Sequence, residues 1–140
     1  MKEGKNSLDF DFYFVSTPIG NMRDISNRAL DILKSVDLVL CEDTRHTLKI
    51  FNKYAINTKM DSFHKHNYFF KIDNIIKKIL EGKKMALVTD AGTPSISDPG
   101  KEIVEKLKSN NIKYTHIPGA SAFLSAYVLS GFDTPFTFIG

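Results

Sequence analysis

Apolar residues in this chain gather in short runs, and the longer segments between the runs are mixed apolar and polar. Such runs are typical of strands that are buried on both faces of a parallel sheet. The expected strands are Phe12–Val15, Leu38–Cys41, Met85–Val88, Tyr114–Ile117 and Phe136–Gly140, with a weaker candidate at Lys59–Phe63.

Between these strands, apolar residues recur three or four positions apart, which predicts amphipathic helices. The helices are expected around Ile25–Val36 with Asp24 as cap, around Leu48–Ala55, and over Phe69, Ile72, Ile76 and Ile79 up to Gly82. Two more are expected after Asp98-Pro99, with Ile103, Val104 and Leu107 inward, and from Ala122 to Leu129 before Gly131. Strands that alternate with helices predict an α/β fold: an open parallel sheet of about five strands flanked by helices.

The 140 residues are enough for one domain with its own core. We expect residues 1–11 to be a polar amino-terminal extension and residues 12–140 to form the α/β domain. The last strand has two interpretations, as a closing edge strand or as the lead into a further part of the protein. We favour the second, because the connection after an apolar strand usually covers its edge.

The bulk composition narrows the class of protein only a little. A net charge of +3 permits a nucleic-acid partner without requiring one, and the lone Cys41 excludes an intramolecular disulfide and fits a reducing compartment. No apolar run reaches the length of a membrane span, and the polar start does not resemble a signal peptide. We therefore expect a cytoplasmic protein with no membrane partner.

Three glycine- and proline-containing loops follow the first, fourth and fifth strands. They are Thr17–Asn21, Asp90–Pro94 and Pro118–Ala122. Parallel strands deliver their carboxyl ends to one edge of the sheet, so these loops are expected to form a ligand cleft there. No loop matches a dinucleotide, Walker A or G-x-S-x-G pattern, and His64 and His66 lack metal-ligand spacing, so we expect no metal site.

A second concentration of chemistry follows the second strand, where Glu42, Asp43, Arg45 and His46 lie close together. These side chains suit the orientation or deprotonation of a substrate hydroxyl, with Arg45 on a phosphate. The alternative is that Asp43 or Thr44 caps the next helix and Arg45 is solvated. The segment Ser62–Asn67 should reach the cleft formed by the three loops, where its histidines are either catalysts or bystanders.

Together, five motifs occur in the order found in one enzyme family. They are Thr17–Asn21, Glu42–Thr47, His64-x-His66-Asn67, Asp90–Pro94 with Ser97–Gly100, and Pro118-Gly119-x-Ser121-Ala122. From Phe12 to Gly140 the chain resembles the amino-terminal domain of the small-subunit ribosomal RNA methyltransferase I family, a branch of the tetrapyrrole methylase superfamily.

The resemblance implies 2′-O-methylation of a cytidine ribose in small-subunit ribosomal RNA, with S-adenosylmethionine as methyl donor and a homodimeric enzyme. In that superfamily the cofactor lies between two α/β domains, so this chain, with one of them, is expected to be inactive alone. The implied cofactor residues are Pro18, Gly20, Asp90, Gly92, Thr93, Pro94, Ser95, Ile96, Ser121 and Ala122. The implied catalytic residues are Glu42, Asp43 or His46 as base or sugar ligand, and Arg45 on RNA phosphate.

The chain departs from the family pattern at Lys65, where an acidic residue is usual, at Ala120 and at Arg23. Lys65 weakens an acid–base role for its loop. Two other functions stay open at this point. One is methylation of a small molecule such as a tetrapyrrole, and the other is a non-enzymatic binding or dimerisation domain. A phosphosugar or nucleotide binder is disfavoured by the lack of a phosphate-loop pattern.

Overall fold

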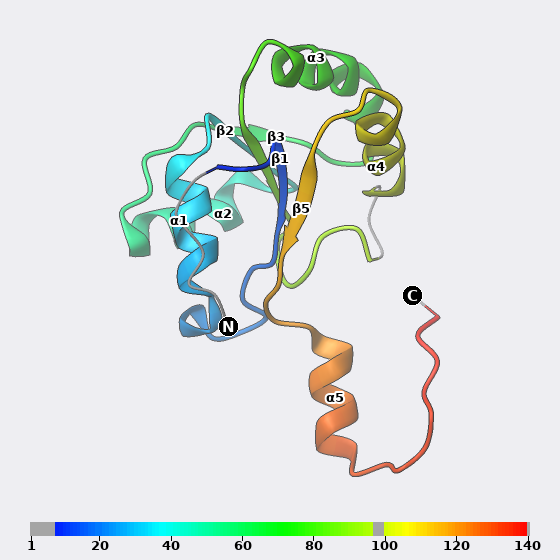
Figure 1. Cartoon of the computed structure of the whole chain (residues 1–140). Helices are drawn as coiled ribbons and strands as arrows, with labels where there is room; N and C mark the ends of the chain where they lie inside the picture. Colours follow the sequence, from blue (N-terminus) through cyan, green and yellow to red (C-terminus); the bar gives the residue numbers. More distant parts are fainter. Residues whose placement is uncertain (1–7, 97–99, 140) are drawn as a thin grey trace.

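A computed structural model describes residues 8–96 and 100–139, which form a parallel sheet flanked by helices (Figure 1). The strands are β1 (Phe12–Val15), β2 (Leu38–Cys41), β3 (Met60–Ser62), β4 (Met85–Val88) and β5 (Tyr114–Ile117). The helices are η1 (Met22–Asp24), α1 (Asn27–Ser35), α2 (Thr44–Tyr54), α3 (Tyr68–Leu80), α4 (Gly100–Ser109) and α5 (Ala122–Ser130). All strand pairs are parallel, in the order β3-β2-β4-β1-β5, which confirms the predicted fold class.

Two hydrophobic cores lie on opposite faces of this sheet. On one face, Tyr13 and Val15 of β1 pack with buried residues of α1 and α2. On the other face, Phe12 and Phe14 pack with buried residues of α3 and α4. Alternate residues of β1 therefore point into different cores, which explains why its four positions are all apolar.

The strand order places β1 and β4 side by side in the middle of the sheet. The helix after β1 covers one face of the sheet and the helix after β4 covers the other, so the chain leaves these two strands toward opposite faces. Open α/β sheets bind ligands at such a point.

The start of α1 differs from the prediction. Asp24 is not its cap, because it lies in the 3-10 turn η1, and Ser26 takes the cap position instead. The Ala29 N–H donates to Ser26 Oγ over 3.0 Å, which is the usual reach of a serine cap. For α2, the alternative that Asp43 caps the helix is confirmed, since the Arg45 N–H donates to Asp43 Oδ1 over 2.8 Å.

Two residues expected to face the core are exposed instead: Leu48 in α2 and Phe69 in α3. The buried stripe of α3 consists of Ile72, Ile75, Ile76 and Ile79. Phe69 is rotated by about 60° from Ile72 around the helix axis, which places it beside that stripe. The predicted end of α3 is confirmed, with Gly82 at φ +97° just after the helix. The predicted Asp98-Pro99 start of α4 lies outside the described residues.

The expected strand at Phe136–Gly140 is wrong over its described part, because residues 135–139 form irregular structure. This segment follows α5, which projects away from the sheet, and it runs back along that helix (Figure 1). The Phe138 ring stacks on Phe123 with centroids 4.6 Å apart, and Phe136 packs against Tyr127 at the same distance. Aromatic contacts with α5 thus replace strand pairing.

Candidate functional site

The loops after β1 and β4 are joined by paired backbone hydrogen bonds. The Thr17 N–H donates to the Gly92 carbonyl over 2.9 Å, and the Gly92 N–H donates to the Thr17 carbonyl over 3.1 Å. The buried Thr17 hydroxyl also donates to the Thr89 carbonyl. The predicted meeting of these loops at one edge of the sheet is therefore confirmed.

An open cleft of about 590 Å³, counting the solvent at its mouth, lies beside this junction. Of the residues proposed for cofactor binding, it is lined by Gly92, Thr93, Ile96, Ser121 and Ala122. Its walls are mostly apolar with a few hydroxyl groups, as is typical of small-molecule sites. Ile19 and Ala91 also line it and lie within the motifs, although they were not proposed for the cofactor, whereas Phe123 and Phe138 lie outside the motifs.

Gly92 shapes the floor of this cleft. Its backbone has φ +84°, a conformation that residues with a side chain rarely adopt. A Cβ atom built there would lie 3.4 Å from Ile19 Cγ2 and 3.8 Å from the Ala120 carbonyl oxygen. The glycine therefore keeps open a space in which a ligand can approach the backbone.

The other residues proposed for cofactor binding lie around the cleft in different ways. Pro18 is buried, whereas Gly20 is exposed and a Cβ atom there would meet nothing within 4 Å. Pro94 and Ser95 line a separate depression together with Phe14, Val104 and His116. The Ser95 hydroxyl is buried and has no hydrogen-bond partner among residues 8–96 and 100–139, and its backbone is left-handed at φ +70°.

Asp90, also proposed for the cofactor, instead links the loop after β4 to the start of α2. Its Oδ1 accepts the Asp43 N–H over 3.1 Å, and its Oδ2 lies 3.8 Å from His46 Nδ1. The sequence did not reveal this link, because 47 positions separate Asp43 from Asp90. Only the adjacency of β2 and β4 in the sheet brings them together.

Asp43 and Arg45 are committed mainly to each other. The Arg45 Nε and Nη2 atoms donate to Asp43 Oδ1 and Oδ2 over 3.0 and 2.6 Å. These hydrogen bonds, together with the Arg45 N–H, lower the pKa of Asp43 to about 2. The Asp43 carboxylate is thus a weak proton acceptor at neutral pH, while the largely exposed Arg45 side chain still faces solvent.

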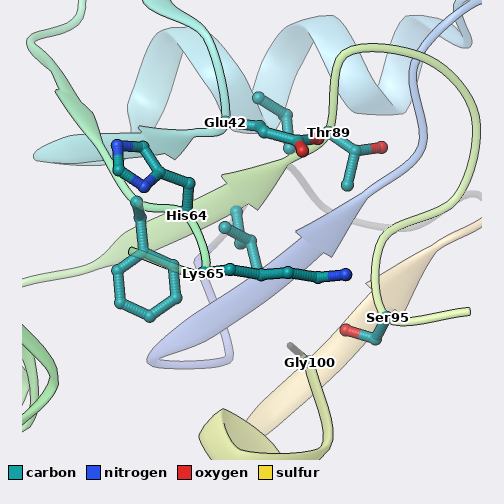
Figure 2. A pocket seen from close by; sticks show the side chains of 9 residues that line it. Glu42, His64, Lys65, Thr89, Ser95 and Gly100 are labelled. Atoms are coloured by element: carbon teal, nitrogen blue, oxygen red, sulfur yellow. The ribbon is translucent and has the colours of Figure 1, made fainter. Parts of the chain in front are cut away.

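A second, shallow pocket of about 350 Å³, counting the open solvent at its mouth, lies beside this cluster and is shown in Figure 2. Glu42 and Thr89 line it from the ends of β2 and β4, and His64 and Lys65 line it from the loop after β3. In Figure 2 the Lys65 side chain points across the pocket toward the loop that carries Ser95. The Ser62–Asn67 loop thus reaches the pocket beside Glu42 and not the cleft beside Gly92, where it was expected, because β3 lies at the far edge of the sheet from β1 and β5.

Asn67 holds this loop in its conformation. Its Oδ1 accepts the His64 N–H over 2.9 Å, and its Nδ2 donates to the Ser62 carbonyl over 3.2 Å. The His66 N–H donates to His64 Nδ1 over 3.2 Å, so that nitrogen already serves as an acceptor. His64 is therefore in part a structural residue of the loop.

The described part of the chain contains neither a cluster of metal ligands nor a membrane-spanning helix. Among residues 8–96 and 100–139, no group of three or more His, Cys, Asp or Glu side chains could hold a metal ion. No helix in these two ranges combines the length and the apolar character needed to cross a membrane.

Comparison with known proteins agrees with the resemblance seen in the motifs. The family model "Tetrapyrrole (Corrin/Porphyrin) Methylases" matches residues 11–139. Relatives called "Ribosomal RNA small subunit methyltransferase I" include that of Mycoplasmopsis pulmonis, 46% identical over 91% of this chain and 58% of the relative. That of Bacillus subtilis is 45% identical over 98% of this chain and 47% of the relative.

A solved structure shares the fold. The uroporphyrin-III-C-methyltransferase of Thermus thermophilus superposes with a TM-score of 0.65 at 20% identity, over 91% of this chain and 53% of that one. This likeness concerns the fold alone. The chain spans about half the length of the curated relatives it matches.

Proposed function

Because this chain belongs to the tetrapyrrole methylase family, we propose that its cleft binds S-adenosylmethionine, the methyl donor of that family. We further propose that the substrate is the 2′-hydroxyl of a cytidine in small-subunit ribosomal RNA. The names of the relatives support ribosomal RNA as substrate. The ribose position and the base follow from the resemblance of the motifs.

The cleft beside Gly92 is the observation that carries the proposal. Its apolar side chains, Ile19, Ile96 and Phe123, suit a planar base and aliphatic carbons, and its hydroxyl groups, on Thr93 and Ser121, suit polar atoms. The space that a Cβ atom at Gly92 would fill allows a ligand to contact the backbone. The residues present therefore fit the cofactor.

When bound, the cofactor supplies a methyl group on a sulfonium centre, which is already a good leaving group. The task of the protein is then to place the hydroxyl oxygen and to remove its proton. Of the three candidate bases, His46 is favoured, because its Nδ1 lies 3.8 Å from Asp90 Oδ2. A small movement would let that carboxylate accept the Nδ1 proton and leave Nε2 free to accept the proton of the substrate. Asp43 is disfavoured by its low pKa.

The neighbouring groups take the remaining tasks. Glu42 lines the pocket of Figure 2 next to the cluster, where its carboxylate would accept hydrogen bonds from the sugar or the base. Arg45 would bind an RNA phosphate with the N–H groups that Asp43 does not use. These roles remain proposals for Glu42 and Arg45.

The assembled enzyme is proposed as a cytoplasmic homodimer that acts on the ribosomal subunit. The exposed apolar side chains of α5, such as Leu124 and Val128, are consistent with contact to another protein surface. Because the chain spans about half the length of its relatives, we propose that it binds cofactor weakly and does not methylate RNA alone.

The test is a methylation assay with a fusion in which this chain replaces the matching part of the Mycoplasmopsis pulmonis relative. Small subunits that lack the modification are incubated with labelled S-adenosylmethionine, and mass spectrometry locates the methyl group. Methylation of a cytidine 2′-oxygen is the expected result. A methyl group on a base, or on an added tetrapyrrole and not on RNA, would contradict the proposed substrate.

A further inference from the structure

Ser16 lies at the centre of a group of hydrogen-bonded side chains. Neither Ser16 nor its partner His116 belongs to any of the sequence motifs. Ser16 directly follows β1 and is 2% exposed. Its Oγ lies 2.9 Å from Thr93 Oγ1 and 2.9 Å from His116 Nε2. Thr93 Oγ1 in turn donates to the Ala120 carbonyl over 3.2 Å. The group thus connects the segments after β1 and β4 with β5 and the loop that follows it.

The number of hydroxyl and imidazole protons available decides which atom donates and which accepts in each of these hydrogen bonds. The Ala120 carbonyl can only accept, so Thr93 uses its single hydroxyl proton there. Thr93 Oγ1 must then accept the hydroxyl proton of Ser16. Having used that proton, Ser16 Oγ accepts from His116 Nε2, which requires the ring to carry its proton on Nε2.

Close packing supports the same arrangement. A Cβ atom at Gly119 would lie 2.8 Å from Ser16 Cβ, so only glycine allows the loop after β5 to lie this close to Ser16. The Ser16 N–H also donates to the Ile117 carbonyl over 3.2 Å. The next residue, Thr17, is paired with Gly92. Ser16 and Thr17 together therefore contact both loops that line the cleft.

We propose that Ser16 and His116 are positioning residues for the cofactor cleft. The hydrogen bonds that run from His116 Nε2–H through Ser16 and Thr93 to the Ala120 carbonyl fix the distance between the loops at 92–94 and 118–122. Neither residue needs to touch the cofactor, since each acts through Thr93 and Ala120. This inference rests on the proposed function, because it assigns the cofactor to that cleft.

The environment of the His116 ring agrees with this series of hydrogen bonds, which runs from His116 through Ser16 and Thr93 to the Ala120 carbonyl. His116 is exposed, yet partial desolvation lowers the pKa of its imidazole, which favours the neutral ring that can hold a single tautomer. The neutral ring with its proton on Nε2 satisfies every donor and acceptor in the series. The opposite tautomer would leave Ser16 and Thr93 with too few protons for three hydrogen bonds.

The first experiment tests this directly in the free chain. Nitrogen-15 NMR of the imidazole at a pH where the ring is neutral distinguishes the two tautomers. The expected spectrum shows His116 protonated on Nε2, with a shift of the Nε2 resonance in Ser16→Ala and no such shift in Ser125→Ala, an exposed serine of α5. A proton on Nδ1, or an unchanged spectrum in Ser16→Ala, would overturn the series.

The second experiment measures S-adenosylmethionine affinity by NMR titration of the 140-residue chain. His116→Leu removes one hydrogen bond of the series, and Ser16→Ala and Thr93→Val each remove two. Each variant is expected to weaken binding roughly 5- to 10-fold or more. The conservative variant His116→Gln keeps a donor at the right place and should restore affinity to within about 2-fold of the unmodified chain. Thermal unfolding of each variant shows whether it is folded.

The two experiments separate the two proposals. If the unmodified chain binds no cofactor at millimolar concentration, the proposed function fails, and the tautomer of His116 still decides the hydrogen-bond series. If the chain binds cofactor and all three disruptive variants bind equally well, the positioning role is wrong. The same conclusion follows if His116→Gln is as weak as His116→Leu.

Discussion

Replacing Gly92 by alanine tests whether the cofactor approaches the backbone of the loop after β4. At φ +84° an L-residue costs roughly 1–2 kcal/mol relative to glycine. The added methyl group would lie 3.4 Å from Ile19 Cγ2, close to ordinary contact, so backbone strain is the larger effect. Either the loop keeps its conformation with a methyl group in the cleft, or it relaxes and changes the shape of the cleft.

Both outcomes weaken binding. If the whole 1–2 kcal/mol is lost from the complex, the dissociation constant for S-adenosylmethionine rises about 5- to 30-fold. The assay is NMR titration of the nitrogen-15-labelled chain, with the free energy of unfolding measured in urea for the same variant. Backbone strain that is already present in the variant without cofactor lowers its free energy of unfolding and is measured in urea.

Gly82→Ala is the matched control. Gly82 has φ +97°, a Cβ atom there would meet no other atom within 4 Å, and the residue follows α3, away from the cleft. Its replacement should cost a similar 1–2 kcal/mol of stability, roughly, and leave cofactor affinity unchanged. Equal affinity in Gly92→Ala and the unmodified chain would refute the assignment of this loop to the cofactor. A loss of affinity in both variants would show that strain alone is responsible.

Three further predictions concern the polar cluster and the core. Because Arg45 holds the pKa of Asp43 at about 2, below its usual value near 3.9, the Asp43 carboxylate stabilises the fold above about pH 4 and loses this effect as pH falls toward 2. Asp43→Asn should flatten the stability profile in that window, as measured by urea unfolding at a series of pH values. In the fusion enzyme, His46→Gln should lower kcat about 10²- to 10⁴-fold, because the base that removes the hydroxyl proton is lost. The control Lys49→Ala, on the exposed side of α2, should leave kcat unchanged. Full activity of His46→Gln would exclude His46 as the base. Ile103→Ala removes a side chain that is 0% exposed and should cost about 2–5 kcal/mol in the free energy of unfolding, and a loss below about 1 kcal/mol would contradict the packing of α4 on the sheet.

The parts of the fold that the sequence predicted best are those set by local patterns. Leu38–Cys41 and Met85–Val88 are apolar at every position because both faces of the sheet are covered, and each is a strand with the predicted bounds. Gly82 ends α3 because it alone adopts the required positive φ without strain. Such signals depend on neighbouring residues only.

The predictions of the α1 cap and of the last strand were wrong because the local sequence is compatible with more than one structure there. Asp24 and Ser26 are both good capping residues, and only the geometry of the preceding turn decides for Ser26. Residues 136–139 have the composition of a strand, yet they follow an exposed apolar helix whose aromatic side chains they contact. Tertiary contacts thus override the local preference there.

The candidate site could be predicted only as far as its motifs reach. The loops at Gly92 and Ser121 were found because glycine, proline and small residues mark close approaches of the backbone. The link from Asp90 to His46 and the contacts of Ser16 with His116 depend on which strands are neighbours, across 44 and 100 positions of sequence respectively. A buried serine and a strand histidine carry no motif of their own, so pattern analysis had no signal to detect them.

The central claim is that S-adenosylmethionine binds where the loops after β1, β4 and β5 meet. Titration of the nitrogen-15-labelled chain with this cofactor tests it most directly, because NMR detects weak binding and identifies the residues involved. The account predicts saturable shifts confined to the amides around Ile19, Gly92, Thr93 and Ser121. An absence of shifts at millimolar cofactor, or shifts centred on another part of the sheet, would contradict it.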